Sequence, residues 1–137
     1  MPRTTSIPRR VALACFGQIA LVVCDLVTLT VALFGVLGMV TSEPSPSDFG
    51  GRIVIGWYLL VSLAGIVLGS ISVGGLWTAS ETAKPIGIVH AIVSCLTCCP
   101  FSWGAAIAAV VTISNDEVGR WPEDAKRGDA TVADVFR

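Results

Sequence analysis

The sequence predicts an all-α integral membrane protein with three transmembrane helices and a short polar C-terminal tail. Of its 137 residues, 53% are hydrophobic and only 14% are charged, and the mean hydropathy is +0.77. A soluble domain of this size is much less apolar. Apart from Asp25, charged residues are absent from three long segments, 11–41, 53–80 and 85–115. Each segment exceeds the about 20 apolar residues that cover a hydrocarbon core roughly 30 Å thick.

The first predicted transmembrane helix covers about residues 11–40. It follows a basic start with Arg3, Arg9 and Arg10, and its apolar run continues well past the length of a secretory signal peptide. The run ends at the loop TSEPSPSDFGG, whose prolines and glycines break helices. As a straight helix this segment is about 45 Å long, so it has to tilt, bend or project beyond the bilayer.

The second predicted helix covers about residues 53–77. Trp57 and Tyr58 lie near one end and Trp77 at the other, a separation of about 30 Å along a helix. Two interfacial belts of aromatic residues are spaced in this way.

The third predicted helix covers about residues 86–114, after the polar turn TASETAK and Pro85. Pro100 interrupts this helix and predicts a kink, because it lacks a backbone donor. A hairpin at CCPF is excluded in this prediction, because each half of about thirteen residues is too short to cross a bilayer. We therefore expect one membrane domain over residues 1–114 and an extramembrane tail over residues 115–137.

Basic residues leave the orientation open. The arginines before the first span favour a cytoplasmic N-terminus, whereas Arg120, Lys126 and Arg127 favour a cytoplasmic tail. Three crossings place these two groups on opposite sides of the membrane. We expect the location to be the plasma (inner) membrane.

Asp25 is the residue that most needs an explanation. A carboxylate at the centre of a membrane helix costs about 2.5–3.5 kcal/mol on insertion scales, so it should not face lipid. On a helix it shares a polar side with Gln18 and Thr28. His90 is expected to lie closer to the interface and to be a poor direct partner. Three roles stay open: an intramembrane contact to another subunit, a neutral hydrogen-bonded residue within this bundle, and a step on an ion or proton path.

Small residues recur on one side of the second and third helices, where they predict close helix packing. They include the GxxxG of Gly65 and Gly69. The full set of predicted packing residues is Ser62, Gly65, Gly69, Ser72, Gly87, Ala91, Ser94 and Cys98.

The sequence offers no candidate catalytic, cofactor-binding or metal-binding residues. All five cysteines fall within the apolar segments, and Cys95-Leu-Thr-Cys98 forms a CxxC. Thiol redox chemistry needs an accessible thiolate, which the middle of a bilayer does not supply. Small apolar packing residues are the preferred interpretation. The nearly balanced charges also give no indication of nucleic-acid binding.

We therefore expect a non-catalytic accessory or assembly subunit, which contacts the lipid bilayer and other integral membrane subunits through Asp25 and the small-residue faces. This hypothesis depends on the small size of the chain and on a carboxylate without a cation in the same membrane segments. The alternative is a small oligomeric transporter or channel with an ion or proton path past Asp25, lined by Gln18 and Thr28.

Overall fold

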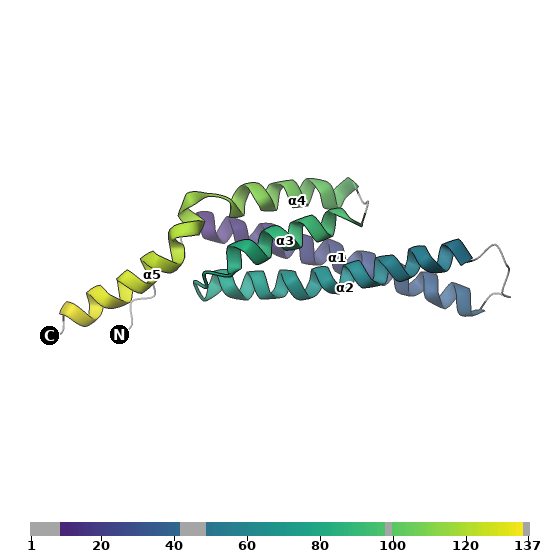
Figure 1. Ribbon diagram of the computed structural model, residues 1–137, viewed down its shortest axis with the longest axis horizontal. Helices are drawn as coiled ribbons and strands as arrows, with labels where there is room; N and C mark the ends of the chain where they lie inside the picture. The colour runs from purple at the N-terminus through teal and green to yellow at the C-terminus, as the bar shows by residue number, and fades with distance from the viewer. Residues whose placement is uncertain (1–8, 42–48, 98–99, 136–137) are drawn as a thin grey trace.

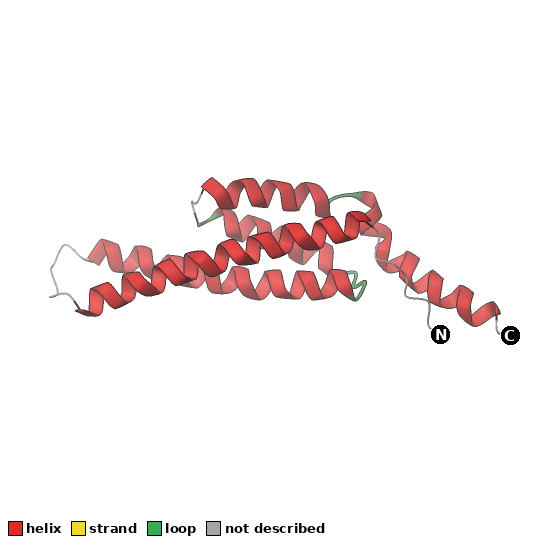
Figure 2. Ribbon diagram, turned by 180° about the vertical axis from the view of Figure 1, so that it is seen from behind, coloured by secondary structure: helices red, strands yellow, loops and turns green. Residues whose placement is uncertain are grey.

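The computed structural model describes residues 9–41, 49–97 and 100–135. These residues form the helices α1 (Arg9–Thr41), α2 (Phe49–Trp77), α3 (Ala83–Cys95), α4 (Pro100–Ile113) and α5 (Asp116–Val135). Figure 2 shows helices joined by short connections, with no strand in these three segments. The predicted all-α fold is confirmed.

The first four helices form a ring (Figure 1). α1 and α2 make a long antiparallel pair, and α3 and α4 make a shorter antiparallel pair that packs against it. With 33 and 29 residues, α1 and α2 are about 50 and 43 Å long. α3 and α4, with 13 and 14 residues, are only about 20 Å long. The short pair therefore covers only the part of the long pair that lies nearest α5 (Figure 1).

The prediction of a single third transmembrane helix is wrong. The chain turns at Leu96 and Thr97, whose N–H groups donate to the carbonyls of Val93 and Ser94. Pro100 then begins α4 rather than kinking a longer helix, because proline suits the first helical position. The length rule that excluded a hairpin applies to helices that cross a bilayer, whereas α3 and α4 pack beside longer helices. In the described segments two helices, α1 and α2, are long and apolar enough to cross a membrane, and not three.

α5 leaves the ring at the end where α1 begins (Figure 1). Arg10 Nε on α1 lies 3.1 Å from Glu117 Oε2 on α5, and Trp121 Nε1 donates to the carbonyl of Leu76 at 3.1 Å. Three crossings predict that the basic start of the chain and the tail lie at opposite ends of the helices. The described part of α1 instead begins at the same end as α5 (Figure 1), because the α3–α4 hairpin reverses the chain once more.

Polar contacts hold α5 against the α2–α3 turn. The side chain of Asn115 caps the helix, its Oδ1 accepting from the N–H of Glu117 at 3.0 Å. Farther along, Lys126 pairs with Glu81 of the turn. Its hydrogen bond and positive charge hold the pKa of Glu81 below the usual value. The polar and charged side chains at this end of the molecule are therefore suited to contact with water.

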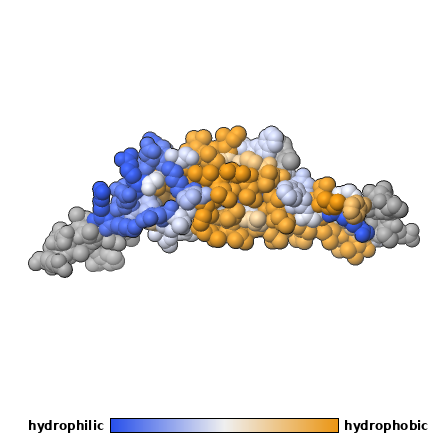
Figure 3. All heavy atoms as spheres, in the orientation of Figure 1, coloured by the Kyte–Doolittle hydropathy of each residue, from blue (hydrophilic) through white to orange (hydrophobic). Residues whose placement is uncertain are grey.

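Large apolar side chains lie on the outside of the ring, and hydrophilic residues gather at the α5 end (Figure 3). Phe16, Phe34 and Val111 are 69%, 70% and 68% exposed. The interior combines small and polar side chains with a few larger apolar ones, such as Leu21 and Ile113. A soluble bundle has the opposite arrangement, so this surface fits the predicted contact with lipid.

The α3–α4 turn is stabilised by side chains that donate to the last carbonyls of α3. Thr97 Oγ1 donates to Ser94 O at 2.7 Å, Trp103 Nε1 to Cys95 O at 3.0 Å and Trp57 Nε1 to Leu96 O at 3.4 Å. Non-helical backbone at membrane depth is tolerated only where such partners satisfy it. Trp57, which the sequence assigns to an interfacial belt, thus helps to hold the turn.

Trp103→Phe keeps an aromatic ring but removes the donor to Cys95 O. We expect the free energy of unfolding to fall by about 1–2 kcal/mol, because a carbonyl away from water loses its partner. Denaturant unfolding in detergent, followed by circular dichroism, measures the change. Trp77→Phe is the matched control, since the Trp77 indole is exposed and has no hydrogen bond in the described part of the chain. Equal losses in the two variants would contradict the role of Trp103.

Candidate functional site: a buried carboxylate and histidine

Polar side chains occupy the centre of the helix ring. The buried polar residues of the described chain are Gln18, Asp25, Ser62, Ser72, His90, Ser94, Thr97 and Ser102. Only Asp25 and His90 among them are ionisable, and they are 1% and 0% exposed. Because an isolated charge is costly to bury, the contacts of these two residues determine the chemistry of the site.

Asp25 on α1 contacts His90 on α3. His90 Nε2 lies 3.0 Å from Asp25 Oδ2, and Ser94 Oγ donates to the same oxygen at 3.2 Å. α1 and α3 are diagonal neighbours in the ring, so this contact crosses its centre. The prediction that His90 lies too close to the interface is wrong. That prediction estimated the depth of His90 from the rise per residue of a straight helix, starting from an assumed membrane surface. It left out the tilt of the helices and the length of the side chains.

Gln18 fixes the hydrogen on the other ring nitrogen of His90. Its Nε2 donates to the carbonyl of Gly87 at 3.2 Å, and its Oε1 lies 2.7 Å from His90 Nδ1. A carbonyl only accepts, so the amide nitrogen must face Gly87 and the amide oxygen must face the imidazole. His90 Nδ1 therefore carries a hydrogen and donates it to Gln18.

With Nδ1 protonated, Asp25 and His90 hold one more proton between them. If this proton lies on His90 Nε2, a carboxylate faces an imidazolium. If it lies on Asp25 Oδ2, a carboxylic acid donates to a neutral imidazole. Both arrangements fit the 3.0 Å separation and have no net charge. The pair is therefore a proton-sharing unit, which is easier to bury than a lone carboxylate.

His90 is the hydrogen-bond partner that the sequence did not identify for Asp25. Burial of Asp25 therefore does not require a cation from another subunit. The neighbouring helices add no charge: α2 faces the pair with Gly65 and Gly69, and α4 packs nearby with Ala106 and Ala109. No group of three His, Cys, Asp or Glu side chains in the described segments could hold a metal ion.

Two glycines of α2 make room for the pair. A Cβ atom on Gly65 would lie 2.3 Å from Asp25 Oδ2, and one on Gly69 would lie 2.5 Å from His90 Cε1. Real Cβ atoms do not approach other atoms so closely, so only glycine permits this packing. The GxxxG of α2 thus packs against α1 and α3 of the same chain.

Gly87 has the same function on α3. A Cβ atom there would lie 2.6 Å from Ser72 Oγ and 3.1 Å from Gln18 Nε2. Ser72 Oγ itself donates to the carbonyl of Ala83 at 3.2 Å. These contacts join the α3 N-terminal half to α1 and α2 beside the pair.

Two other predicted residues make none of the hydrogen bonds described for the pair. Thr28 Oγ1 donates to the carbonyl of Cys24 in its own helix at 2.9 Å, and its polar contact with another subunit stays a prediction. Ala91 is buried in an apolar cluster of α1, α3 and α4. Cys98 lies outside the described residues.

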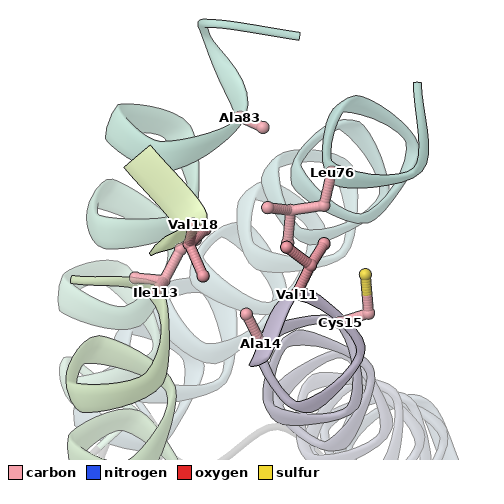
Figure 4. Packing of buried hydrophobic residues seen from close by; sticks show 7 residues of the cluster. All are labelled: Val11, Ala14, Cys15, Leu76, Ala83, Ile113 and Val118. Atoms are coloured by element: carbon pink, nitrogen blue, oxygen red, sulfur yellow. The ribbon is translucent and has the colours of Figure 1, made fainter. Parts of the chain in front are cut away.

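Apolar side chains close the ring between the pair and the α5 end. Figure 4 shows this apolar plug, which consists of Val11, Ala14, Cys15, Leu76, Ala83, Ile113 and Val118. All five helices contribute to it. Two surface pockets at this end, one beside Trp121 and one beside Arg10, include neither Asp25 nor His90 in their walls.

The other side of the pair is incompletely satisfied. Asp25 Oδ1 and Ser62 Oγ are buried and have no hydrogen-bond partner among the described residues. Buried polar atoms are nearly always paired, so these two mark a place where the protein interacts with something else.

His90 was the main residue that sequence reasoning missed. It is the only histidine of the chain, and it lies three residues after Gly87 and four before Ser94. This spacing places it on the small-residue face of its helix, so the signal was present in the periodicity.

Gly65→Ala tests the packing against Asp25. We expect the free energy of unfolding to fall by about 1–3 kcal/mol, because the new methyl group collides with the carboxylate. The matched control is Gly56→Ala on the same helix, where a Cβ meets nothing within 4 Å. The control should be neutral or up to about 1 kcal/mol more stable, since alanine favours helix. Thermal unfolding in detergent compares the two, and equal stabilities would contradict the packing.

No protein-family model, curated protein or solved structure matches this chain. The site itself is therefore the basis for a proposed function.

Proposed function

We propose that this chain is a small membrane protein that binds a proton at Asp25 and His90 and carries it across the bilayer. One observation supports this above all: a carboxyl oxygen and an imidazole nitrogen lie 3.0 Å apart, at hydrogen-bond distance, and both side chains are buried at the centre of a helix ring. Ionisable side chains inside membrane helices commonly belong to proton or ion pathways. The geometry thus favours the transporter alternative over an assembly contact through Asp25. A single chain is sufficient to form the proton site.

In this proposal α1 and α2 cross the plasma (inner) membrane, and the α5 end is cytoplasmic. The basic residues at that end are Arg9, Arg10, Lys84, Arg120, Lys126 and Arg127, whereas Arg52 lies near the start of α2 at the other end. Under three crossings, the arginines before the first span and the basic residues of the tail predict opposite orientations. Under two crossings, both groups lie on the same side and predict the same orientation. An excess of basic residues marks the cytoplasmic side.

Transport requires that the proton enters from one side and leaves on the other. The described arrangement is closed toward the α5 end by the apolar plug. Delivery of the proton to the α5 side therefore requires a second conformation, in which the helices that carry the plug residues separate. α3 and α4 are the helices that move most easily in this scheme, because they are short and their turn is held by a few hydrogen bonds.

Asp25→Asn tests the proposal, because it keeps the shape of the side chain and removes the proton-binding group. The protein is reconstituted into liposomes with a pH-sensitive dye inside, and a potassium gradient with valinomycin sets the voltage. We expect wild-type liposomes to acidify and Asp25→Asn liposomes to behave like empty ones. An asparagine N–H still donates to a neutral His90, so the variant should fold.

Two results would overturn the proposal: equal proton flux in wild-type and Asp25→Asn liposomes, or wild-type flux no greater than that of empty liposomes. Gly56→Ala provides a variant control, since this exposed position is distant from the site in the sequence of α2.

An accessory subunit is the second candidate, and a different observation favours it. Beyond the α3–α4 turn, the described chain places no further helix beside α1 and α2 (Figure 1). Leu37, Val40 and Phe49 are 57%, 77% and 70% exposed on this part of the two helices. Helices of another subunit would fit beside this part of the pair. Absent wild-type flux, together with a stoichiometric membrane protein that co-purifies in mild detergent, would favour this candidate.

A further inference from the structure

We infer that Asp25 Oδ1 and Ser62 Oγ hold a water molecule between them, and that this water is the proton route of Asp25 toward the end of the ring opposite α5. The inference rests on the proposed proton site and names the route by which that site is loaded.

The two oxygens of Asp25 have different surroundings. Oδ2 contacts His90 Nε2 and accepts from Ser94 Oγ, so its lone pairs are occupied. Oδ1 has no partner among the described residues, and neither has Ser62 Oγ, although both residues are at least 99% buried. Such a pair of atoms is where proteins keep ordered water, which forms two to four hydrogen bonds with buried polar groups.

The helix geometry places Ser62 within reach of the carboxylate. Gly65 packs directly on Asp25, and a Cβ atom there would lie 3.2 Å from Oδ1. Ser62 is three residues earlier on α2, and side chains at this spacing share a face with Cβ atoms about 5–6 Å apart. The Ser62 side chain therefore lies on the face of α2 that packs against Asp25, and one water with hydrogen bonds of about 2.8 Å on each side is the bridge that we infer between the two oxygens.

The direction of this route follows from the run of α2. Leu76, the residue before the C-terminal Trp77 of α2, belongs to the apolar plug at the α5 end, so Ser62 lies farther from that end than Gly65 does. On the α5 side of the pair stands Gln18, whose amide is neither an acid nor a base and is already bonded to Gly87. The proton therefore exchanges on the Ser62 side.

Each step of the route conserves protons. Loading begins from the pair without its shared proton, which is a carboxylate beside a neutral imidazole. An incoming proton protonates Ser62 Oγ, which passes its own hydroxyl hydrogen to the water. The water passes one of its hydrogens to Asp25 Oδ1, the carboxylate becomes a carboxylic acid, and the pair ends with no net charge. Ser62 and the water each end with the same number of hydrogens that they had at the start. Release of the proton follows the same steps in reverse.

Water fits this place better than a small cation does. The pair is neutral with its shared proton, and a neutral water keeps it so. A sodium ion would add a positive charge beside a histidine that already carries a hydrogen on Nδ1.

Ser62→Val and Ser62→Thr form the test pair, because valine and threonine have the same shape and only threonine keeps a hydroxyl. The single histidine of the full-length chain is labelled with ¹⁵N, and the protein is placed in lipid nanodiscs and transferred to D₂O. The measured quantity is the rate at which the hydrogen on His90 Nε2, on the Asp25 side of the ring, exchanges for deuterium. We expect Ser62→Val to slow exchange about tenfold, the factor that corresponds to one buried hydrogen bond, and Ser62→Thr to resemble wild type.

Equal exchange rates in the two variants would overturn the water route. If the added methyl group prevents folding, Ser62→Ala against wild type gives the same comparison without added volume. Rates that change when choline replaces sodium in the buffer would also overturn it, since they would indicate a bound cation.

This result is independent of the transport assay. Slow exchange in Ser62→Val without any wild-type flux would support the water route and reject proton transport. Flux that Asp25→Asn abolishes, with equal exchange rates in the Ser62 variants, would support transport and reject this route.

Discussion

A carboxylate buried among apolar helices must receive hydrogen bonds from the same protein, and in this chain α3 provides them. His90 and Ser94 both contact Asp25 Oδ2, so the bond joins two helices that otherwise touch little across the ring. The close approach depends on glycine at positions 65 and 69 of α2, where any larger residue collides with the pair. Gln18 then sets the hydrogen on the far side of the imidazole. The residues of the site are thus the same residues that pack the interior of the helix ring.

The hairpin of α3 and α4 is what brings His90 to this position. Both helices are too short to cross a bilayer independently, and their connecting turn exposes carbonyls that need donors. Thr97, Trp103 and Trp57 supply them from α3–α4 and from α2. The pair itself is buried, and the apolar plug at the base of the hairpin separates it from the α5 end. Function in this proposal follows from that asymmetry.

The sequence predicts the all-α fold well and the connection of the second half of the chain poorly. The two long apolar helices and the small-residue side of α2 follow from periodicity and charge, which are local properties. Whether residues 86–114 kink or fold back depends on tertiary contacts, because Pro100 is compatible with both. His90 was misplaced for the same reason, since its depth was measured along one straight helix. Gln18 and Asp25 were found because they break an apolar pattern, but their partner was visible only once the hairpin was known.

The central claim is that Gln18 keeps a hydrogen on His90 Nδ1 while Asp25 and His90 share a second proton. ¹⁵N nuclear magnetic resonance of the labelled single histidine, in lipid nanodiscs across the pH range in which the protein is folded, tests it most directly. The account predicts a protonated Nδ1 throughout, with the second proton shared between Nε2 and the carboxyl group. A neutral imidazole that carries its hydrogen on Nε2 and none on Nδ1 would contradict it.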